Sequence, residues 1–159
     1  MTRGFRYWYC AAGLMLSLGC SSDSAKTPVW PDPVPVSGTV TYGDQPLADA
    51  MVTFSPTGTT AGQGAAGLTD NSGKYVLQAP WTDGKTRPGA IPGTYKVSIS
   101  RMVKADGSVW KPDPKSPDAG PMSIGAREEM PEQYSFQSKL TADVSKDNGV
   151  FDFKLEKAQ

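Results

Sequence analysis

The chain has 159 residues, of which 38% are hydrophobic and 20% charged, and its 16 basic residues balance its 16 acidic residues. This length holds one small domain, and a chain without a basic excess is a poor candidate for binding nucleic acid. Histidine is absent, which removes the commonest general base and metal ligand, so we expect no enzyme activity, no metal and no other cofactor.

Residues 1–19 have the pattern of a secretory signal. Arg3 and Arg6 provide the positive start, and residues 7–18 form a run without charge that ends just before Gly19 and Cys20. The run is shorter than the ~20 residues of a membrane-spanning helix, as is typical of a signal peptide.

The segment Leu16-Ser17-Leu18-Gly19-Cys20 resembles the lipoprotein signal of bacteria, although its leucine and its small residue are exchanged relative to the usual order. The resemblance implies a lipoprotein signal peptide over 1–19, lipidation of Cys20 with diacylglyceryl (palmitate-type) chains, and anchoring to the membrane of the cell envelope. Ser21 favours the outer membrane, with the protein facing the periplasm or the cell surface. The alternative is an ordinary secretory signal with an unmodified thiol.

Residues 20–35 are rich in serine, proline and aspartate, which predicts a flexible, disordered tether. Its prolines favour extended conformations, and at about 3.1 Å per residue it could hold a domain some 40 Å from a membrane. Trp30 is the one side chain here for which we consider packing back onto the domain.

From residue 36 onward, apolar and polar residues alternate with a period of two, which predicts half-buried strands. Gly43-Asp44-Gln45-Pro46 and Asp70-Asn71-Ser72-Gly73 are turn sequences, and the Asn-Gly pair near residue 148 predicts a hairpin joining the last two strands. Residues 57–64 and 80–92 are expected to be loops. The expected strands are 36–42, 50–55, 65–69, 74–79, 95–100, 140–144 and 151–155.

No segment has apolar residues at helical spacing over three turns, so we predict an all-β, seven-stranded Greek-key β-sandwich over residues 36–157. Residues 101–133 contain five prolines and form a long loop insertion, which in a compact domain is either functional or mobile.

Several short motifs between residues 36 and 134 occur in an order that is typical of a known domain family. Val36-Ser37-Gly38-Thr39-Val40, Thr69-Asp70-Asn71-Ser72-Gly73-Lys74-Tyr75 and Pro92-Gly93-Thr94-Tyr95 are followed by Met130-Pro131-Glu132-Gln133-Tyr134. This order resembles the carboxypeptidase regulatory-like (transthyretin-like) domains of small lipoproteins from planctomycete-type bacteria. The resemblance implies a prealbumin-like sandwich with an accessory or binding role and no enzymatic activity.

Two acidic groups are candidate sites. Asp70 and its neighbours offer oxygen ligands that suit calcium, but they lack the spacing of an EF-hand, and a tight turn is the favoured interpretation. Glu128, Glu129 and Glu132 could act as paired carboxylates in glycoside hydrolysis, whereas a solvated loop is the favoured interpretation.

The loop tryptophans Trp81 and Trp110 are the candidate ligand contacts, and Trp30 is similar to them in lying beside proline. Exposed at one end of a sandwich, they would favour contact with protein or carbohydrate; otherwise they cover open edges of the core. We therefore predict a non-catalytic cell-envelope lipoprotein whose partners are the membrane, through the lipid anchor, and an envelope protein or glycan. The alternatives are a carbohydrate-binding envelope module and an enzyme that uses the glutamates of 128–132.

Overall fold

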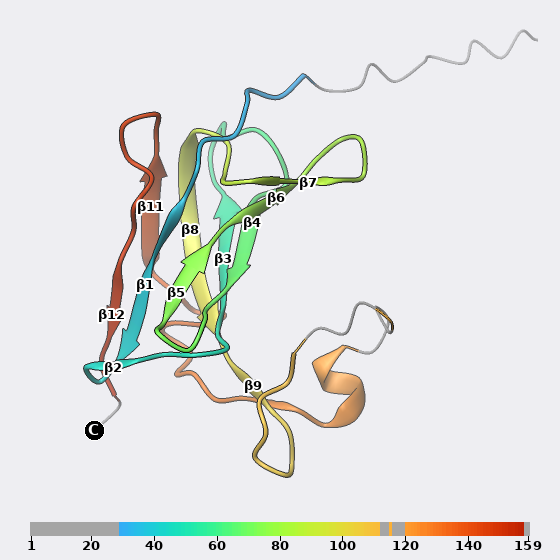
Figure 1. Cartoon of the computed structure of the whole chain (residues 1–159), viewed down its shortest axis with the longest axis vertical. Coiled ribbons are helices and arrows are strands. Elements are labelled where there is room, and N and C mark those ends of the chain that lie inside the picture. The colour runs from blue at the N-terminus through green and yellow to red at the C-terminus, as the bar shows by residue number, and fades with distance from the viewer. Residues whose placement is uncertain (1–28, 112–114, 116–119, 158–159) are drawn as a thin grey trace, which may run out of the picture.

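The computed structural model describes residues 29–111, 115 and 120–157, and the predicted signal and Cys20 lie outside this part. The described chain is all-β: it contains twelve strands and one short 3-10 turn, η1 (Pro121–Ile124), and no α-helix. The strands form two principal sheets that pack face to face (Figure 1). The strands are β1 (Ser37–Tyr42), β2 (Gln45–Pro46), β3 (Met51–Pro56), β4 (Ala65–Leu68), β5 (Lys74–Val76), β6 (Gln78–Pro80), β7 (Thr86–Pro88), β8 (Gly93–Ser100), β9 (Met102–Val103), β10 (Arg127–Glu128), β11 (Leu140–Val144) and β12 (Phe153–Leu155).

The larger sheet has six strands in the order β11-β8-β3-β4-β6-β7, and every neighbouring pair is antiparallel. Its long central pair, β3 and β8, places Phe54 opposite Val97 and Val52 opposite Ile99. All four side chains are buried, because alternate residues of a strand point to the same face of the sheet. The polar residues between them face outward.

The smaller sheet is built around β1, which pairs with β12 in parallel and with β5 in antiparallel orientation. A tight turn joins β1 to β2, and both of its central residues, Gly43 and Asp44, have positive φ (56° and 61°). Two positive φ angles are the signature of a type I′ hairpin turn, which confirms the predicted turn at Gly43 and Asp44, whereas Gln45 and Pro46 form a strand instead of part of the turn.

Aromatic side chains join the two sheets. The ring of Phe54, from the larger sheet, lies 5.7 Å from that of Tyr95 and 6.4 Å from that of Phe153, between centroids. Phe153 belongs to the smaller sheet and stacks on Tyr75 at 6.4 Å. Each fully buried side chain of this size stabilises the fold by roughly 1.5–3 kcal/mol, so this cluster contributes several kcal/mol to the shared core.

The two buried tyrosines keep their hydroxyls hydrogen-bonded. Tyr75 donates to the carbonyl oxygen of Phe151 at 2.7 Å, and Tyr95 donates to that of Ile91 at 2.6 Å. Burial raises the pKa of both phenols above the ordinary value, since it disfavours the charged form. Both tyrosines therefore remain neutral donors inside the sandwich.

The predicted strand 74–79 is divided between the two sheets. Its first half, β5, pairs with β1, and its second half, β6, pairs with β4 in the larger sheet. Leu77 lies at the crossing, fully buried, and donates its N–H to Val36. The period-two pattern continues through the crossing because Tyr75, Leu77 and Ala79 all face the same core.

The predicted hairpin between the last two strands is wrong. β11 pairs with β8 in the larger sheet, whereas β12 pairs with β1 in the smaller one. Ser145 and Asn148 hydrogen-bond to each other in a tight turn, after which the chain crosses between the layers. A tight turn reverses the chain locally, but it does not determine which strand each arm then joins.

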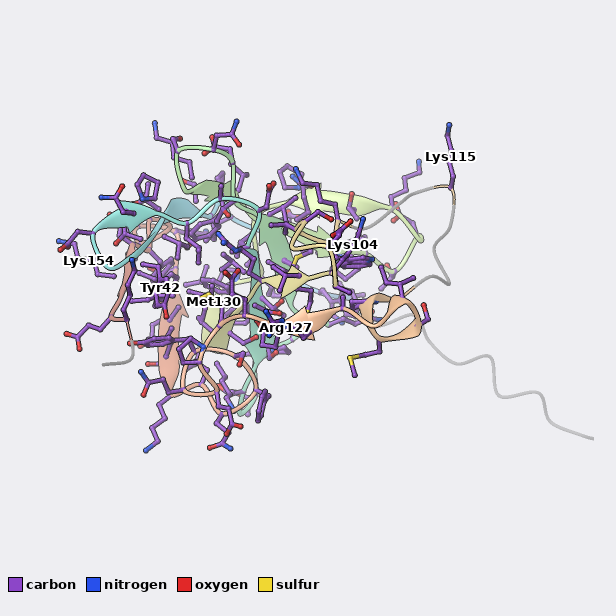
Figure 2. The ribbon with its side chains drawn as sticks, turned by 90° about the horizontal axis from the view of Figure 1, so that it is seen from below. Tyr42, Lys104, Lys115, Arg127, Met130 and Lys154 are labelled. Atoms are coloured by element: carbon purple, nitrogen blue, oxygen red, sulfur yellow. The ribbon has the colours of Figure 1, made fainter. Side chains whose placement is uncertain are left out.

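Three segments expected to lack strands contribute to the fold. Residues 80–92 include β7, which forms a hairpin with β6. Within the predicted tether, Val34 exchanges two backbone hydrogen bonds with Ala90, at 2.9 and 3.0 Å. The insertion 101–133 begins and ends in the β9–β10 pair, and its Met130 is 4% exposed and belongs to the hydrophobic core. In Figure 2, Met130 lies among the central side chains, while Lys154 and Lys115 lie at the margins.

Candidate functional site

A small apolar groove lies between the outer face of the larger sheet and the insertion. Its volume is about 210 Å³, below the ~300–1,000 Å³ of pockets that hold drug-sized ligands. A space of this size accommodates one apolar side chain of a partner. We call it the Trp110 groove; its lining residues are Asp49, Met51, Leu68, Ser100, Met102, Trp110 and Pro121.

The floor of the Trp110 groove is a row of residues across three strands. Met51 of β3 pairs with Leu68 of β4 on one side and with Ser100 of β8 on the other. Directly opposed residues of neighbouring strands point to the same face of the sheet, here the outer face. Leu68 is 39% exposed, so this row places apolar surface where a sheet normally presents polar side chains.

The insertion forms the wall of the groove. Trp110 donates its backbone N–H to the carbonyl of Met102 at 2.7 Å, and Val103 and Val109 form a bridge just beyond it. These bonds fix the backbone of Trp110 beside β9. The indole is half-buried, and a rigid aromatic surface of this kind is a common anchor for binding because little entropy is lost when it is covered.

The charged groups at the groove neutralise each other. Asp49 is its one charged lining residue, and its carboxylate lies 2.7 Å from the ammonium group of Lys111. The groove is therefore an apolar and electrically neutral surface, suited to contact and not to acid–base chemistry.

Trp81 lies in a separate cluster with Trp30. The two rings meet edge to face, with centroids 5.4 Å apart, which confirms that Trp30 packs against the domain. The guanidinium of Arg87 lies 4.2 Å from the centroid of the Trp81 ring and forms an ion pair with Asp32 at 3.8 Å. Because Arg87 covers one face of the indole, a sugar ring cannot stack on that face of Trp81.

The structure does not bring Trp81 and Trp110 together. β6 pairs antiparallel with β4 through Gln78 and Ala66, and it therefore runs toward the Pro56 end of β3. Trp81 directly follows β6 and lies at that end of the sheet. Trp110 lies at the Met51 end of β3. Figure 1 shows the β6–β7 hairpin and β9 at opposite ends of the sandwich. The two candidate contact residues thus belong to different surfaces, and no shared aromatic platform forms.

The acidic candidate residues form hydrogen bonds that stabilise the local backbone, and Asp70 is the first example. The Asp70 carboxylate accepts hydrogen bonds from the hydroxyl and the N–H of Ser72 and from the N–H of Lys74. The Ser72 hydroxyl is the main reason that the pKa of Asp70 is lowered, followed by these N–H groups. This arrangement is an Asx-type turn, as the favoured interpretation predicted.

Glu128, Glu129 and Glu132 do not face one another across a cleft, as the two carboxylates of a glycoside hydrolase would. Glu128 is partly buried, not solvated as expected, and accepts hydrogen bonds from the Ser100 hydroxyl and from the N–H groups of Arg101 and Met130. Glu129 forms an ion pair with the Arg101 side chain, and the exposed Glu132 accepts a bond from Gln137. Glu128 and Glu129 thus hold the ends of the insertion together.

We expect Glu128→Ala to lower the free energy of unfolding by about 2 kcal/mol, because two backbone N–H groups lose their acceptor in a partly buried place. Urea unfolding followed by circular dichroism measures this change. Glu132→Ala is the matched control and should stay within about 0.5 kcal/mol, since its side chain is exposed. Equal stability of Glu128→Ala and the unaltered protein would show that Glu128 does not brace the insertion.

Sequence reasoning missed the apolar row of Met51 and Leu68. The position of Met51 could have revealed this row. In 50–55, Met51 lies on the outward face with Thr53 and Ser55, where a polar residue is expected. Period-two alternation assigns a side chain to a face, but it cannot show that outward positions on neighbouring strands lie side by side.

Among the residues that the structure describes, no group of three or more His, Cys, Asp or Glu side chains is arranged to hold a metal ion. Within the same residues, no helix has the length and apolar character needed to cross a bilayer. The chain matches no family model, and no curated protein or solved structure shows significant similarity to it.

Proposed function

We propose that this chain is an exported envelope protein, anchored through lipid on Cys20, whose sandwich is a non-catalytic module for protein contact. The support for the anchor is the uncharged run 7–18 that ends at Gly19 and Cys20. We further propose that the sandwich is of the Greek-key, prealbumin-like type. Strands in all seven predicted segments and the crossings between layers at Leu77 and at residues 145–149 support this assignment.

The Trp110 groove is the observation that carries the binding role. It combines a half-buried indole with the apolar row of Met51 and Leu68, and its charge is neutralised at the rim. Side chains that enter such small apolar pockets supply most of the energy of many protein interfaces. The partner fitting this surface is an envelope protein that presents one protruding aromatic or aliphatic side chain.

Cross-linking in intact cells, followed by purification from the membrane fraction and mass spectrometry, tests the binding role. We expect one recurrent protein partner, whose yield falls about tenfold in Trp110→Ala because a central anchor contributes at least 1.4 kcal/mol. Phe136→Ala is the control: Phe136 is 65% exposed and does not line the groove, so its yield should not change. A partner retained in full by Trp110→Ala would contradict the groove, and recovery of glycan instead of protein would favour the carbohydrate-binding alternative.

The same preparation tests the anchor. We expect an N-terminal peptide that starts at a diacylated Cys20, and we expect Cys20→Ala to move the protein to the soluble fraction, since several acyl chains make membrane binding stable. A soluble wild-type protein with an unmodified N-terminus would refute the lipoprotein part of the proposal.

A further inference from the structure

A second surface lies at the end of the sandwich where the chain enters it. We call it the entry cluster, defined by Trp30, Asp32, Trp81 and Arg87, whose contacts are the ring pair, the cation over the indole and the ion pair already described. Both tryptophans are half-buried, and Val29 beside them is 98% exposed. Nothing in the binding role proposed for the Trp110 groove uses these residues.

Because of the contacts of the entry cluster, fewer residues separate the folded domain from Cys20 than the predicted tether contains. The predicted tether ran to residue 35, but Trp30, Asp32 and Val34 are all held by the domain. Nine residue steps then separate Cys20 from Val29, and even a fully extended chain covers only about 30 Å over nine steps. A lipid on Cys20 therefore keeps this end of the sandwich close to the bilayer.

The chemistry of the entry cluster suits the boundary between lipid and water. Tryptophan is enriched at membrane interfaces, because its ring is apolar while its N–H prefers a polar neighbour. Residues 29–32 and 81–88 carry two acidic side chains, Asp32 and Asp83, and two basic ones, Lys85 and Arg87. Because this surface has no net charge, anionic lipids should neither strengthen nor weaken its binding to the membrane.

We propose that the entry cluster rests in the headgroup layer of the membrane that holds the anchor. This inference depends on the lipid anchor at Cys20. The entry cluster lies at the Pro56 end of β3, and the Trp110 groove lies at the Met51 end. When the entry cluster contacts the membrane, the groove therefore faces away from it. The orientation of the domain thus directs its apolar groove to partners in the aqueous space.

Tryptophan quenching by brominated lipid tests the orientation. Removal of residues 1–19 eliminates Trp8 and leaves Trp30, Trp81 and Trp110. The lipidated protein that begins at Cys20 is reconstituted into phosphatidylcholine vesicles brominated at the acyl carbons nearest the headgroups. In Trp110→Phe, we expect about half of the emission to be lost, because its two remaining indoles lie in the interface. In the double variant Trp30→Phe/Trp81→Phe, the remaining Trp110 should be quenched little, and added phosphatidylglycerol should change neither result.

Flotation of the vesicles separates failure of the anchor from failure of the orientation. A chain that does not float with the vesicles refutes the lipid anchor and, with it, this inference. A chain that floats while Trp30 and Trp81 stay unquenched refutes the orientation and leaves the anchor intact. Stronger quenching of Trp110 than of the other pair would reverse the orientation and also overturn the inference.

Discussion

Replacing Phe54 by alanine is expected to lower the free energy of unfolding by about 3–5 kcal/mol. Phe54 is fully buried, and its ring contacts Tyr95 from its own sheet and Phe151 and Phe153 from the opposite side of the core. Its removal leaves a cavity between the two layers. Urea unfolding of residues 21–159, followed by tryptophan fluorescence and circular dichroism, measures the change.

Phe136→Ala is the matched control for this substitution. It removes the same side chain from a position that is 65% exposed, and its effect should stay within about 0.5 kcal/mol. Similar losses from the two substitutions would mean that the layers do not meet at Phe54, and the sandwich described here would then be wrong.

Gly38→Ala is expected to lower the free energy of unfolding by about 3 kcal/mol or more, since overpacking against a rigid backbone adds to the loss of hydrogen bonds. A Cβ atom at Gly38 would lie 1.8 Å from the carbonyl oxygen of Phe151 and 3.0 Å from the hydroxyl of Tyr75. The same Phe151 carbonyl accepts the Tyr75 hydrogen bond, and the Phe151 N–H donates to Ser37. The methyl group therefore forces β1 away from the chain that leads into β12. Thermal unfolding monitored by circular dichroism, together with urea unfolding, reports the loss.

Gly120→Ala provides the comparison for the glycine substitution. Apart from its chain neighbours, no described residue has a heavy atom within 4 Å of a Cβ atom built at Gly120, and its φ of −64° is open to any residue. We expect a change within about 0.5 kcal/mol, or slight stabilisation through the unfolded chain. If Gly38→Ala were as well tolerated as Gly120→Ala, the close approach of β1 to Phe151 would be disproved.

The Trp110 groove and the entry cluster place the loop tryptophans on two separate surfaces, for which we propose different roles. Trp81 is packed by Trp30 and Arg87 at one end of the larger sheet, and Trp110 is held by β9 at the other. In these proposals, the end with Trp81 contacts the bilayer and the end with Trp110 binds a partner. The quenching and cross-linking experiments test these two ends independently.

Sequence patterns correctly predicted the seven principal strand segments, although they missed β7, β9 and β10. Alternation in 50–55 and 95–100 correctly predicted the buried set that includes Phe54 and Tyr95, because a period of two assigns each side chain to one face. Turn chemistry at 43–46 and 70–73 was equally local, since glycine, asparagine and aspartate favour these turns through their own backbone.

The sheet that each strand joins depends on tertiary packing and could not be predicted from local patterns. The segment 74–79 keeps one alternating pattern although it pairs with β1 in its first half and with β4 in its second. The Asn-Gly turn near residue 148 leads from one sheet to the other instead of closing a hairpin. Both outcomes bury the same residues in the shared core, so the pattern cannot distinguish them. The Trp110 groove and the Trp30–Trp81 pair likewise join residues far apart in the chain, and such contacts depend on packing that no local pattern encodes.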